Sequence, residues 1–309
     1  MIDLTSPLRY PGSKYILAQY FESTINENLL TGCHFYEPYA GGASTSLYLL
    51  GHEIISRASL VERDPLIYAF WKCVQGQPEE LCERIRRLRI TMGTWKRFQQ
   101  FLTPNALREH CLLDLGVAGL FLNRTNFSGI LSAKPIGGMS QTSEYKIDCR
   151  FNKQRIIDAI MKIAPFRKRI SVYWGDAVKF LRSRQDKIAA EHSLVYIDPP
   201  YLQQGPRLYR YFYQDAQHRE LAEFLNPSPF RWVVSYDNHP FIHGLFKDQQ
   251  IVPIHLNYAV KKSRKAEELL IANITLNEPS YYYSTRRLRT QEQRGDGEAN
   301  QRRMKICAS

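Results

Sequence analysis

Short apolar runs alternate with helical patterns in the first part of this 309-residue chain. Residues 33–37 form a β-like run, and a glycine turn separates this run from the helical pattern of residues 44–50. A second apolar run, at 58–62, ends in Arg63-Asp64-Pro65 and leads into apolar residues at helical spacing. Two consecutive strand-turn-helix units predict a parallel sheet.

The same alternation returns in the last part of the chain, where three strand-like runs each lead directly to an acidic residue: Asp176, Asp198 or Asp237. Two further runs are joined by a basic loop at 261–265 and predict a pair of strands. These five runs lie at 170–174, 194–197, 232–235, 251–256 and 268–274.

The middle of the chain has a different character, with charged amphipathic helix patterns at 79–90 and 95–101 and a glycine-rich polar stretch around 128–145. The simplest organisation is therefore one α/β domain, residues 1–72 and 169–278, interrupted by an inserted module at 73–168. Residues 279–309 are rich in arginine and poor in apolar side chains, which predicts a basic flexible tail.

Lysine and arginine number 42 against 30 aspartates and glutamates, a formal charge of +12 that suits a polyanionic partner such as nucleic acid. The six cysteines form no Cys-x-x-Cys pair, so we expect free thiols and no metal site. No apolar stretch approaches the length of a membrane span, and the start of the sequence has no secretory pattern. These features predict a cytoplasmic protein without a membrane partner.

The clearest chemical motif is Asp198-Pro199-Pro200-Tyr201, which directly follows the apolar run at 194–197. Open α/β sheets bind ligands at the carboxyl ends of their strands, so this is a position for catalysis. The prolines lack amide donors, which leaves carbonyls that can accept hydrogen bonds from an amino group. The Asp198 carboxylate and the Pro199 carbonyl could accept the two protons of an aromatic amine, and Tyr201 could stack on its ring. Without further motifs, an edge turn with an aspartate cap is the alternative.

Several motifs in one order resemble those of the Dam-type DNA adenine N6-methyltransferases. Residues 7–14 (Pro-Leu-Arg-Tyr-Pro-Gly-Ser-Lys) resemble the family's N-terminal motif for S-adenosylmethionine (SAM). Residues 37–42 (Glu-Pro-Tyr-Ala-Gly-Gly) resemble its glycine loop, and residues 123–129 (Asn-Arg-Thr-Asn-Phe-Ser-Gly) resemble the segment that precedes its recognition residues. The resemblance covers nearly the whole chain up to residue 278.

This resemblance implies a Rossmann-like SAM-dependent methyltransferase fold, a mostly parallel sheet with one antiparallel strand, and an inserted, mainly helical target-recognition domain. It also implies SAM as the cofactor. A glycine turn lets the backbone approach a cofactor, and an acid about 20 residues further on can hold ribose hydroxyls. The residues expected at the cofactor are Tyr10, Gly12, Lys14, Glu37, Pro38, Tyr39, Ala40, Gly41, Asp64, Asp176, Ala177 and Asp198.

Without the resemblance, Lys14 would be interpreted as an ordinary lysine at a helix start and Asp64 as a helix N-cap before Pro65. The sequence also departs from the family pattern. Ala43 stands where the glycine loop usually has its second glycine, and Ser13 replaces a common glycine. The stretch 132–150 does not resemble the recognition segment of GATC-specific members, so the target sequence is left open.

The expected partner is double-stranded DNA, from which an adenine must be flipped out of the stack before its amine can react. Basic side chains would neutralise phosphates, amide side chains would pair with adenine edges, and aromatic and basic residues after Asp198 would form a wall for the flipped base. For each of these residues a solvated polar loop is the alternative. The residues expected at DNA are Asn123, Arg124, Asn126, Lys134, Gln141, Arg150, Asn152, Arg207, Tyr209 and Tyr211.

Two kinds of alternative remain at this stage. The first is transfer to another planar amine, of an RNA adenine, cytosine N4 or a protein glutamine, although the carboxylate at Asp198 favours adenine. The second is a catalytically silent DNA-binding protein on the same scaffold. We expect a monomer or weak dimer, in contact with the DNA of a bacterium or phage, and the sequence leaves open whether its role is restriction-modification, phage biology or epigenetic marking.

Overall fold

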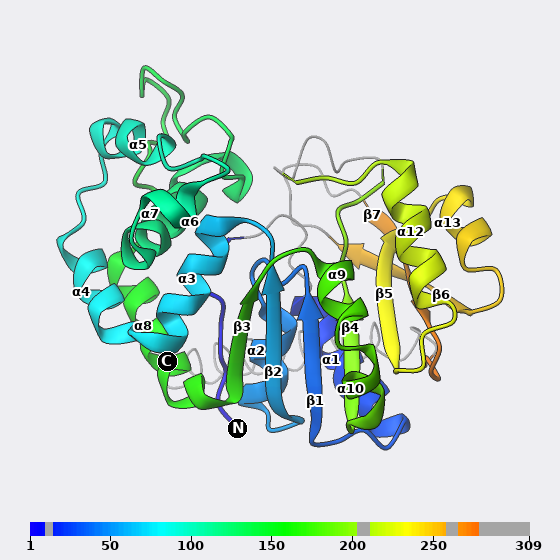
Figure 1. Ribbon diagram of the computed structural model, residues 1–309. Helices are drawn as coiled ribbons and strands as arrows, with labels where there is room; N and C mark the ends of the chain where they lie inside the picture. Colours follow the sequence, from blue (N-terminus) through cyan, green and yellow to red (C-terminus); the bar gives the residue numbers. More distant parts are fainter. Residues whose placement is uncertain (10–14, 203–210, 258–264, 278–309) are drawn as a thin grey trace, which may run out of the picture.

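The computed structural model describes residues 1–9, 15–202, 211–257 and 265–277. Its centre is a seven-stranded sheet with the order β3-β2-β1-β4-β5-β7-β6 (Figure 1). Strand β7 is antiparallel to both of its neighbours, and the other adjacent strands are parallel, as predicted. The strands are β1 (Cys33–Pro38), β2 (Ile55–Glu62), β3 (Ile170–Trp174), β4 (Ser193–Ile197), β5 (Trp232–Asp237), β6 (Gln250–Asn257) and β7 (Lys265–Ala272).

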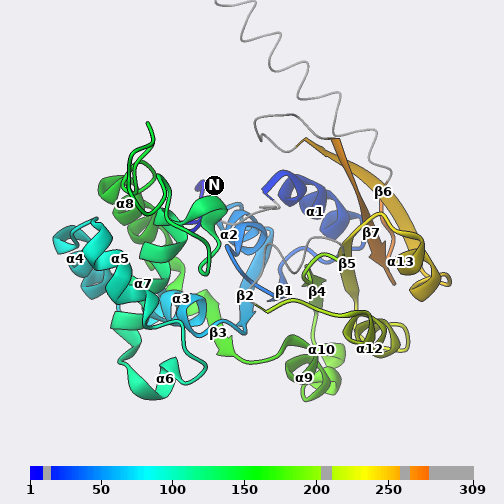
Figure 2. The same ribbon diagram turned by 90° about the horizontal axis from the view of Figure 1, so that it is seen from above.

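Helices cover both faces of the sheet (Figure 2). Side chains of β4 alternate between the two layers because successive strand residues point to opposite faces. Leu194 and Tyr196 pack in the layer of α1 and α2, whereas Val195 and Ile197 pack in the layer of α9, α10, α12 and α13. These helices are α1 (Tyr15–Glu27), α2 (Ser44–Gly51), α9 (Ala177–Arg182), α10 (Gln185–Ala190), α12 (Asp215–Leu225) and α13 (Pro240–Leu245).

The segment between β2 and β3 forms a helical module beside the sheet (Figure 1). Helix α3 (Pro65–Gly76) runs through the expected boundary between residues 72 and 73, so sheet domain and module share one continuous helix. The remaining elements are α4 (Pro78–Arg87), α5 (Met92–Gln99), α6 (Ala106–Glu109), α7 (Leu112–Thr125), η1 (Phe127–Gly129), α8 (Lys153–Ile163) and η2 (Ala164–Arg169).

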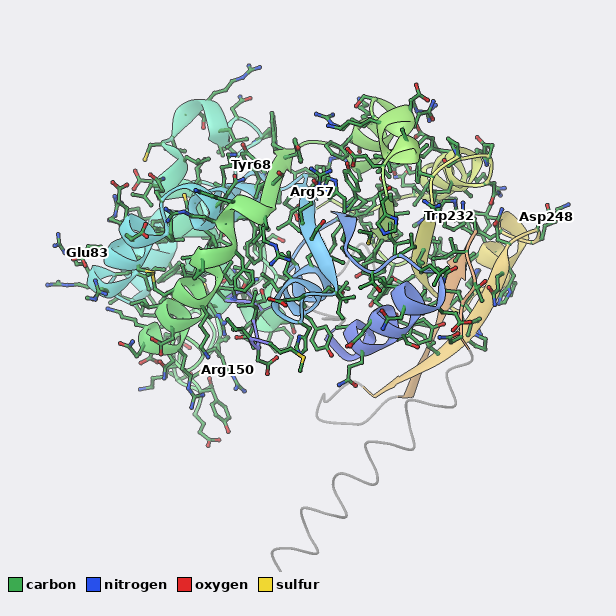
Figure 3. All side chains as sticks on the ribbon, turned by 90° about the horizontal axis from the view of Figure 1, so that it is seen from below. Arg57, Tyr68, Glu83, Arg150, Trp232 and Asp248 are labelled. Carbon is green, nitrogen blue, oxygen red and sulfur yellow. The ribbon has the colours of Figure 1, made fainter. Side chains whose placement is uncertain are left out.

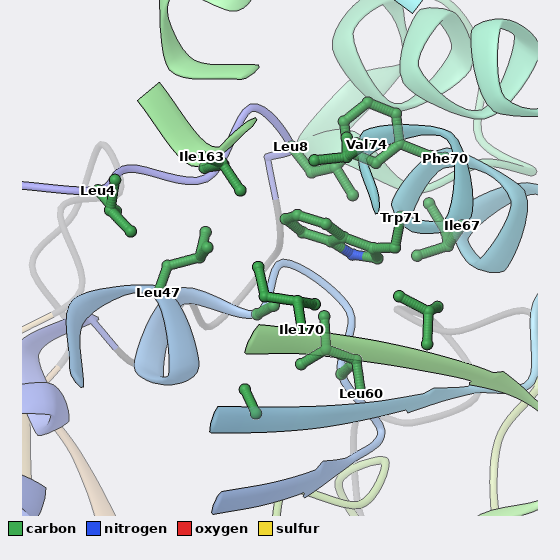
Figure 4. Packing of buried hydrophobic residues seen from close by; sticks show 14 of the residues in the cluster. Leu4, Leu8, Leu47, Leu60, Ile67, Phe70, Trp71, Val74, Ile163 and Ile170 are labelled. Carbon is green, nitrogen blue, oxygen red and sulfur yellow. The ribbon is translucent and has the colours of Figure 1, made fainter. Parts of the chain in front are cut away.

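One continuous apolar core joins the module to the sheet, and Trp71 of α3 lies at its centre (Figure 4). Its indole N–H donates to the Gly41 carbonyl at 2.7 Å, so the buried polar atom is satisfied and the loop after β1 is fixed to α3. Leu60 and Ile170 meet it from β2 and β3. Among the residues that the structure describes, no helix is long and apolar enough to cross a bilayer.

Two glycines of α7 allow this helix to lie close against α3. A Cβ atom at Gly119 would come within 2.6 Å of the Leu66 carbonyl oxygen, and one at Gly116 within 3.1 Å of the Ala69 carbonyl oxygen. Backbone atoms at such distances cannot move aside as the end of a flexible side chain can. The α3 and α7 contact therefore depends on the absence of side chains at these positions.

Exchange of Gly119 for alanine tests this contact. We expect Gly119→Ala to lower the free energy of unfolding by about 1–3 kcal/mol, because overpacking outweighs the better helix propensity of alanine. The matched control is Gly93→Ala in α5, where the nearest atom to a new Cβ is 3.7 Å away. The control should be neutral or stabilising by up to about 1 kcal/mol. Urea unfolding of both variants checks this, and equal effects would contradict the packing argument.

Candidate active site

The parallel strands place five loops at one edge of the sheet, because their carboxyl ends all point the same way. Acidic residues lie at or directly after the end of each of these strands. They are Glu37 on β1, Glu62 on β2, Asp176 after β3, Asp198 after β4 and Asp237 on β5. The fold thus brings these five acidic residues to one edge of the sheet.

Asp198 begins the loop after β4, followed by the buried Pro199 and Pro200. Its Oδ1 atom accepts a hydrogen bond of 2.8 Å from the Ser235 hydroxyl on β5. The Tyr201 hydroxyl donates to the Glu268 carboxylate at 3.1 Å, which fixes the aromatic side chain to β7. Three strands therefore hold the loop that the sequence predicts to be catalytic.

The loop from β1 to α2 has an unusual backbone. Tyr39, Gly41 and Ala43 all have positive φ angles, of 64°, 47° and 49°. Ala43, which stands where a glycine was expected, adopts this left-handed conformation as the N-cap of α2. Three left-handed residues within five positions make this a tight turn.

Glu37 lies beneath this loop and is 5% exposed. Its carboxylate accepts hydrogen bonds from the Ser46 backbone N–H at 3.1 Å and from the Ser46 hydroxyl. Burial raises the pKa of Glu37 to about 7, and the Asp198 carboxylate contributes in the same direction. Glu37 therefore lies near Asp198 and holds the start of α2 in place.

Glu62 is the acidic residue at β2 that reaches the glycine loop. It is buried and accepts from the Gly41 N–H at 3.0 Å and from the Asp64 N–H at 2.9 Å. Burial raises its pKa to about 7. Asp64 instead caps α3 through a 2.9 Å bond from the Leu66 N–H. The alternative interpretation of Asp64 as an N-cap is confirmed, and the sequence analysis missed Glu62.

A signal for Glu62 was present in the sequence. It is the last residue of an apolar strand and lies 21 residues after Gly41, which is the spacing of an acid that holds ribose hydroxyls. Asp64 Oδ1 caps α3, whereas the Glu62 carboxylate is bonded to the glycine loop itself through the Gly41 N–H.

Asp176 and Ala177 form the start of α9 after β3. Asp176 accepts from the Lys179 N–H at 3.1 Å as the N-cap, and its carboxylate lies 3.7 Å from the Arg63 guanidinium. Arg63 also stacks over the Tyr211 ring, with 5.1 Å between the guanidinium carbon and the ring centre. Tyr211 therefore lies near the ends of β2 and β3. Its expected contact with a flipped base stays a prediction.

The chemistry of these side chains fits SAM. Glu37, Glu62 and Asp198 are carboxylates at one edge of a protein whose net charge is +12. SAM has positively charged sulfonium and ammonium groups and ribose hydroxyl donors, so carboxylates are complementary to it. Tyr10, Gly12 and Lys14 lie outside the described residues. Within the described ranges, no three His, Cys, Asp or Glu side chains converge as metal ligands would.

Two amides that were expected to read DNA bases have a structural role instead. Asn123 is fully buried and bonds to both the N–H and the carbonyl of Arg9 at 2.6 Å. Asn126 is also fully buried, accepts from the Trp95 indole at 2.6 Å and donates to the Leu131 carbonyl at 2.7 Å. Their burial argues against direct base contact: Asn123 holds the N-terminal segment to the module, and Asn126 holds parts of the module together.

Three further polar residues in this set are also held by backbone atoms. Arg124 donates to the Pro7 carbonyl at 2.6 Å, and burial lowers its pKa to about 10. Gln141 donates to the Ile136 and Gly138 carbonyls. Asn152 caps α8.

Lys134 and Arg150 of the expected set are exposed. Arg207 and Tyr209 lie outside the described residues. Arg9 is a residue that the sequence analysis missed: its Nη1 atom is buried without a hydrogen-bond partner in the described part of the chain. Burial lowers the Arg9 pKa, and the charge of Arg150 adds to this effect. An unpartnered guanidinium nitrogen beside a second arginine favours an acceptor from an anionic partner.

The strand order, with the antiparallel β7 between β5 and β6, and the acidic residues at the strand ends are those of a Rossmann-like fold. The model of the D12 class N6 adenine-specific DNA methyltransferases matches residues 10–260, and the chain belongs to this family. The chain is thus an adenine-specific DNA methyltransferase that uses SAM as methyl donor and DNA as substrate. No curated protein matches the chain.

Solved structures similar to the chain include two methyltransferases. The Bacillus subtilis m1A22 tRNA methyltransferase TrmK is 11% identical, with a TM-score of 0.32 over 90% of this chain and 85% of that chain. The precorrin-6y C5,15-methyltransferase from Geobacter metallireducens is 10% identical, with a TM-score of 0.34 over 86% of this chain and 93% of that chain.

Proposed function

We propose that the enzyme acts on an adenine flipped out of double-stranded DNA and that Asp198, Pro199, Pro200 and Tyr201 form the catalytic loop. The carrying observation is that this loop lies at the carboxyl end of a central strand, with its carboxylate bonded to Ser235 and its tyrosine bonded to Glu268. A loop held in this way can present a carboxylate, a carbonyl and a ring to one planar amine.

The adenine amine is a weak nucleophile because its lone pair is delocalised into the ring. The Asp198 carboxylate and the Pro199 carbonyl would each accept a hydrogen bond from the amine, which localises the lone pair on nitrogen, and Tyr201 would stack on the base. SAM supplies an electrophilic methyl group. A base stacked inside the duplex cannot reach such a loop. We therefore include base flipping in the proposal, at a cost of a few kcal/mol.

For the cofactor, we assign the glycine loop and Glu62 rather than Asp64. Gly41 and Glu62 are joined by a hydrogen bond, so a ligand at the loop meets the Glu62 carboxylate. Glu37, Pro38, Tyr39 and Ala40 shape this loop, and Asp176 with Ala177 borders it at β3. Tyr10, Gly12 and Lys14 remain expected cofactor contacts.

The exposed cations of the module are assigned to DNA phosphates. Lys134 and Arg150 are exposed, and Phe127, Met139 and Tyr145 on the same segment expose apolar surface that can contact sugars and bases. We expect a monomer or weak dimer. We also expect it to act in the cytoplasm, on bacterial or phage DNA. Arg207 and Tyr209 stay predictions for the wall of the base pocket.

Removal of the catalytic carboxylate tests the proposed reaction. Asp198→Ala should lower the rate of methyl transfer by at least about 10³-fold, because the amine loses its main acceptor. DNA affinity should change little, since phosphate contacts dominate it. The measurement is incorporation of labelled methyl groups into DNA, with Asp186→Ala, an exposed aspartate on α10, as the matched control.

Expression in a host without adenine methylation extends this test. Sequencing that reports N6-methyladenine should find marks with the unaltered enzyme and none with Asp198→Ala, and the marks define the recognised sequence. A fully active Asp198→Ala enzyme would refute the assignment of the loop. Marks on cytosine, or on RNA alone, would refute the choice of substrate.

The two acids near β2 can be told apart by conservative exchange. Glu62→Gln should weaken SAM binding by about 10-fold to 100-fold, because an amide oxygen is a weaker acceptor for ribose hydroxyls than a carboxylate, and the amide NH2 cannot accept from the Gly41 or Asp64 N–H. Asp64→Asn should leave the SAM Kd unchanged, since asparagine also caps a helix. Calorimetric titration with SAM measures both. A larger loss for Asp64→Asn than for Glu62→Gln would reverse the assignment.

The DNA surface is tested through its salt dependence. The double variant Lys134→Ala, Arg150→Ala should reduce the slope of log Kd against log salt by about 2, because each phosphate contact contributes about 0.9. Lys247→Ala is the control: Lys247 neighbours Asp248, which lies on the opposite side of the molecule from Arg150 (Figure 3). Fluorescence anisotropy over about 50–200 mM salt checks this. An unchanged slope in the double variant would exclude these two residues from the interface.

A further inference from the structure

A buried pair of hydroxyl groups lies directly behind the proposed catalytic carboxylate. Ser235 on β5 donates to Asp198 Oδ1 at 2.8 Å, and the Tyr196 hydroxyl lies 3.1 Å from Ser235 Oγ. Both Tyr196 and Ser235 are fully buried. The three side chains therefore form a hydrogen-bonded line that ends at the reacting group.

The register of β4 and β5 makes this line possible. Tyr196 pairs with Val233 and Ile197 with Val234, so the next position places Asp198 beside Ser235. Side chains two residues apart on a strand share a face, so Tyr196 and Asp198 point to the same layer. Ser235 on β5 points to the same layer, and its hydroxyl bonds to both side chains.

The direction of the hydrogen bonds follows from the proton count. A serine hydroxyl has one hydrogen, and Ser235 gives it to Asp198. Tyr196 must then donate its hydrogen to Ser235 Oγ. Such a chain is cooperative, since each donor polarises the next, and it acts in a buried environment where hydrogen bonds are stronger than in water.

The ring of Tyr196 is itself held in place. It packs on Phe21 of α1, with 4.4 Å between ring centres, and on Phe35 of β1, with 6.3 Å between ring centres. The hydroxyl therefore has little freedom to turn away from Ser235. A fixed tyrosine fixes the serine, and the serine fixes one oxygen of the carboxylate.

We propose that Ser235 and Tyr196 are positioning residues for methyl transfer: they orient the Asp198 carboxylate and stabilise its ionised form, which is the form that accepts the amine protons. This proposal rests on the assignment of Asp198 as the catalytic acceptor. It adds residues from two strands to the catalytic loop and gives the buried hydroxyls a function beyond packing.

Ionisation of Asp198 needs this support because other acids lie nearby. Among the described residues, Glu37 on β1 is coupled to the Asp198 charge. Asp237 on β5 accepts from the Leu202 N–H at 3.2 Å, and Glu268 on β7 accepts from Tyr201, so two more carboxyls border the same loop. Neighbouring negative charges favour the protonated acid, whereas a donated hydrogen bond favours the carboxylate.

The test is single-turnover methyl transfer at saturating SAM and DNA as a function of pH. Ser235→Ala should lower the rate constant by about 10-fold to 100-fold, with the Kd of SAM and of DNA nearly unchanged. Its acid limb should move to higher pH by about half a unit to one unit, because Asp198 loses a hydrogen bond to its charged form. Ser235→Thr, which keeps the hydroxyl, should restore most of the rate and the original acid limb.

Tyr196→Phe should have a smaller effect, about twofold to tenfold, because Ser235 still donates to Asp198. The double variant Ser235→Ala, Tyr196→Phe should be no slower than Ser235→Ala alone, since the line is already broken at the serine. Effects that multiply in the double variant would overturn the line of hydrogen bonds.

Tyr236→Phe is the matched control. It removes a buried hydroxyl from the next position of β5, where the hydroxyl bonds to His218 at 2.9 Å in the opposite layer. This variant should lose stability without losing rate. A Ser235→Ala enzyme with normal rate and normal pH profile would overturn the positioning role. If Asp198→Ala is inactive in that case, the proposed function stands and only the positioning role fails.

Discussion

Buried and partly buried carboxylates at one edge of a parallel sheet are the constraint on which the site depends. A buried charge is costly unless hydrogen bonds replace the water that it loses. Here donors from the protein backbone and from hydroxyls meet this need: Ser46 for Glu37, Gly41 for Glu62, Ser235 for Asp198 and Tyr201 for Glu268. These bonds also order the loops that contain the donors, so the shape of the site follows from the need to satisfy its acids.

Charge is thereby divided between two partners. Cations on the module, such as Lys134 and Arg150, are exposed, and they suit DNA phosphates. The acids at the strand ends suit a positively charged cofactor with hydroxyl groups. The net charge of +12 is only the sum over the chain and does not show where the cations or the acids lie. The same chain can attract DNA through its exposed cations while the acids at the strand ends favour a positively charged cofactor.

Several contacts join the module to the sheet and to the N-terminal segment. Helix α3 is continuous between them, and the two glycines of α7 allow close contact with it. Asn123 joins α7 to Arg9, the last described residue before the N-terminal motif at 10–14. Under the proposed function, the module that contacts DNA is therefore joined to the cofactor site by a continuous helix and by the bonds of Asn123 to Arg9.

The sequence by itself determined the strand-forming segments, the mostly parallel character of the sheet and the acids Asp176, Asp198 and Asp237 near three strand ends, because apolar runs and turn residues are local signals. It also led to the proposal of a catalytic loop at Asp198, since the tetrad and the strand before it are adjacent in the chain. Only the tertiary structure decided that Glu62 rather than Asp64 faces the glycine loop, that Asn123 and Asn126 are buried, and that Ser235 and Tyr196 support Asp198. The physical reason is that burial and hydrogen-bond partners depend on residues far apart in the chain, and no local pattern encodes whether a polar side chain meets solvent, a ligand or the protein's own backbone.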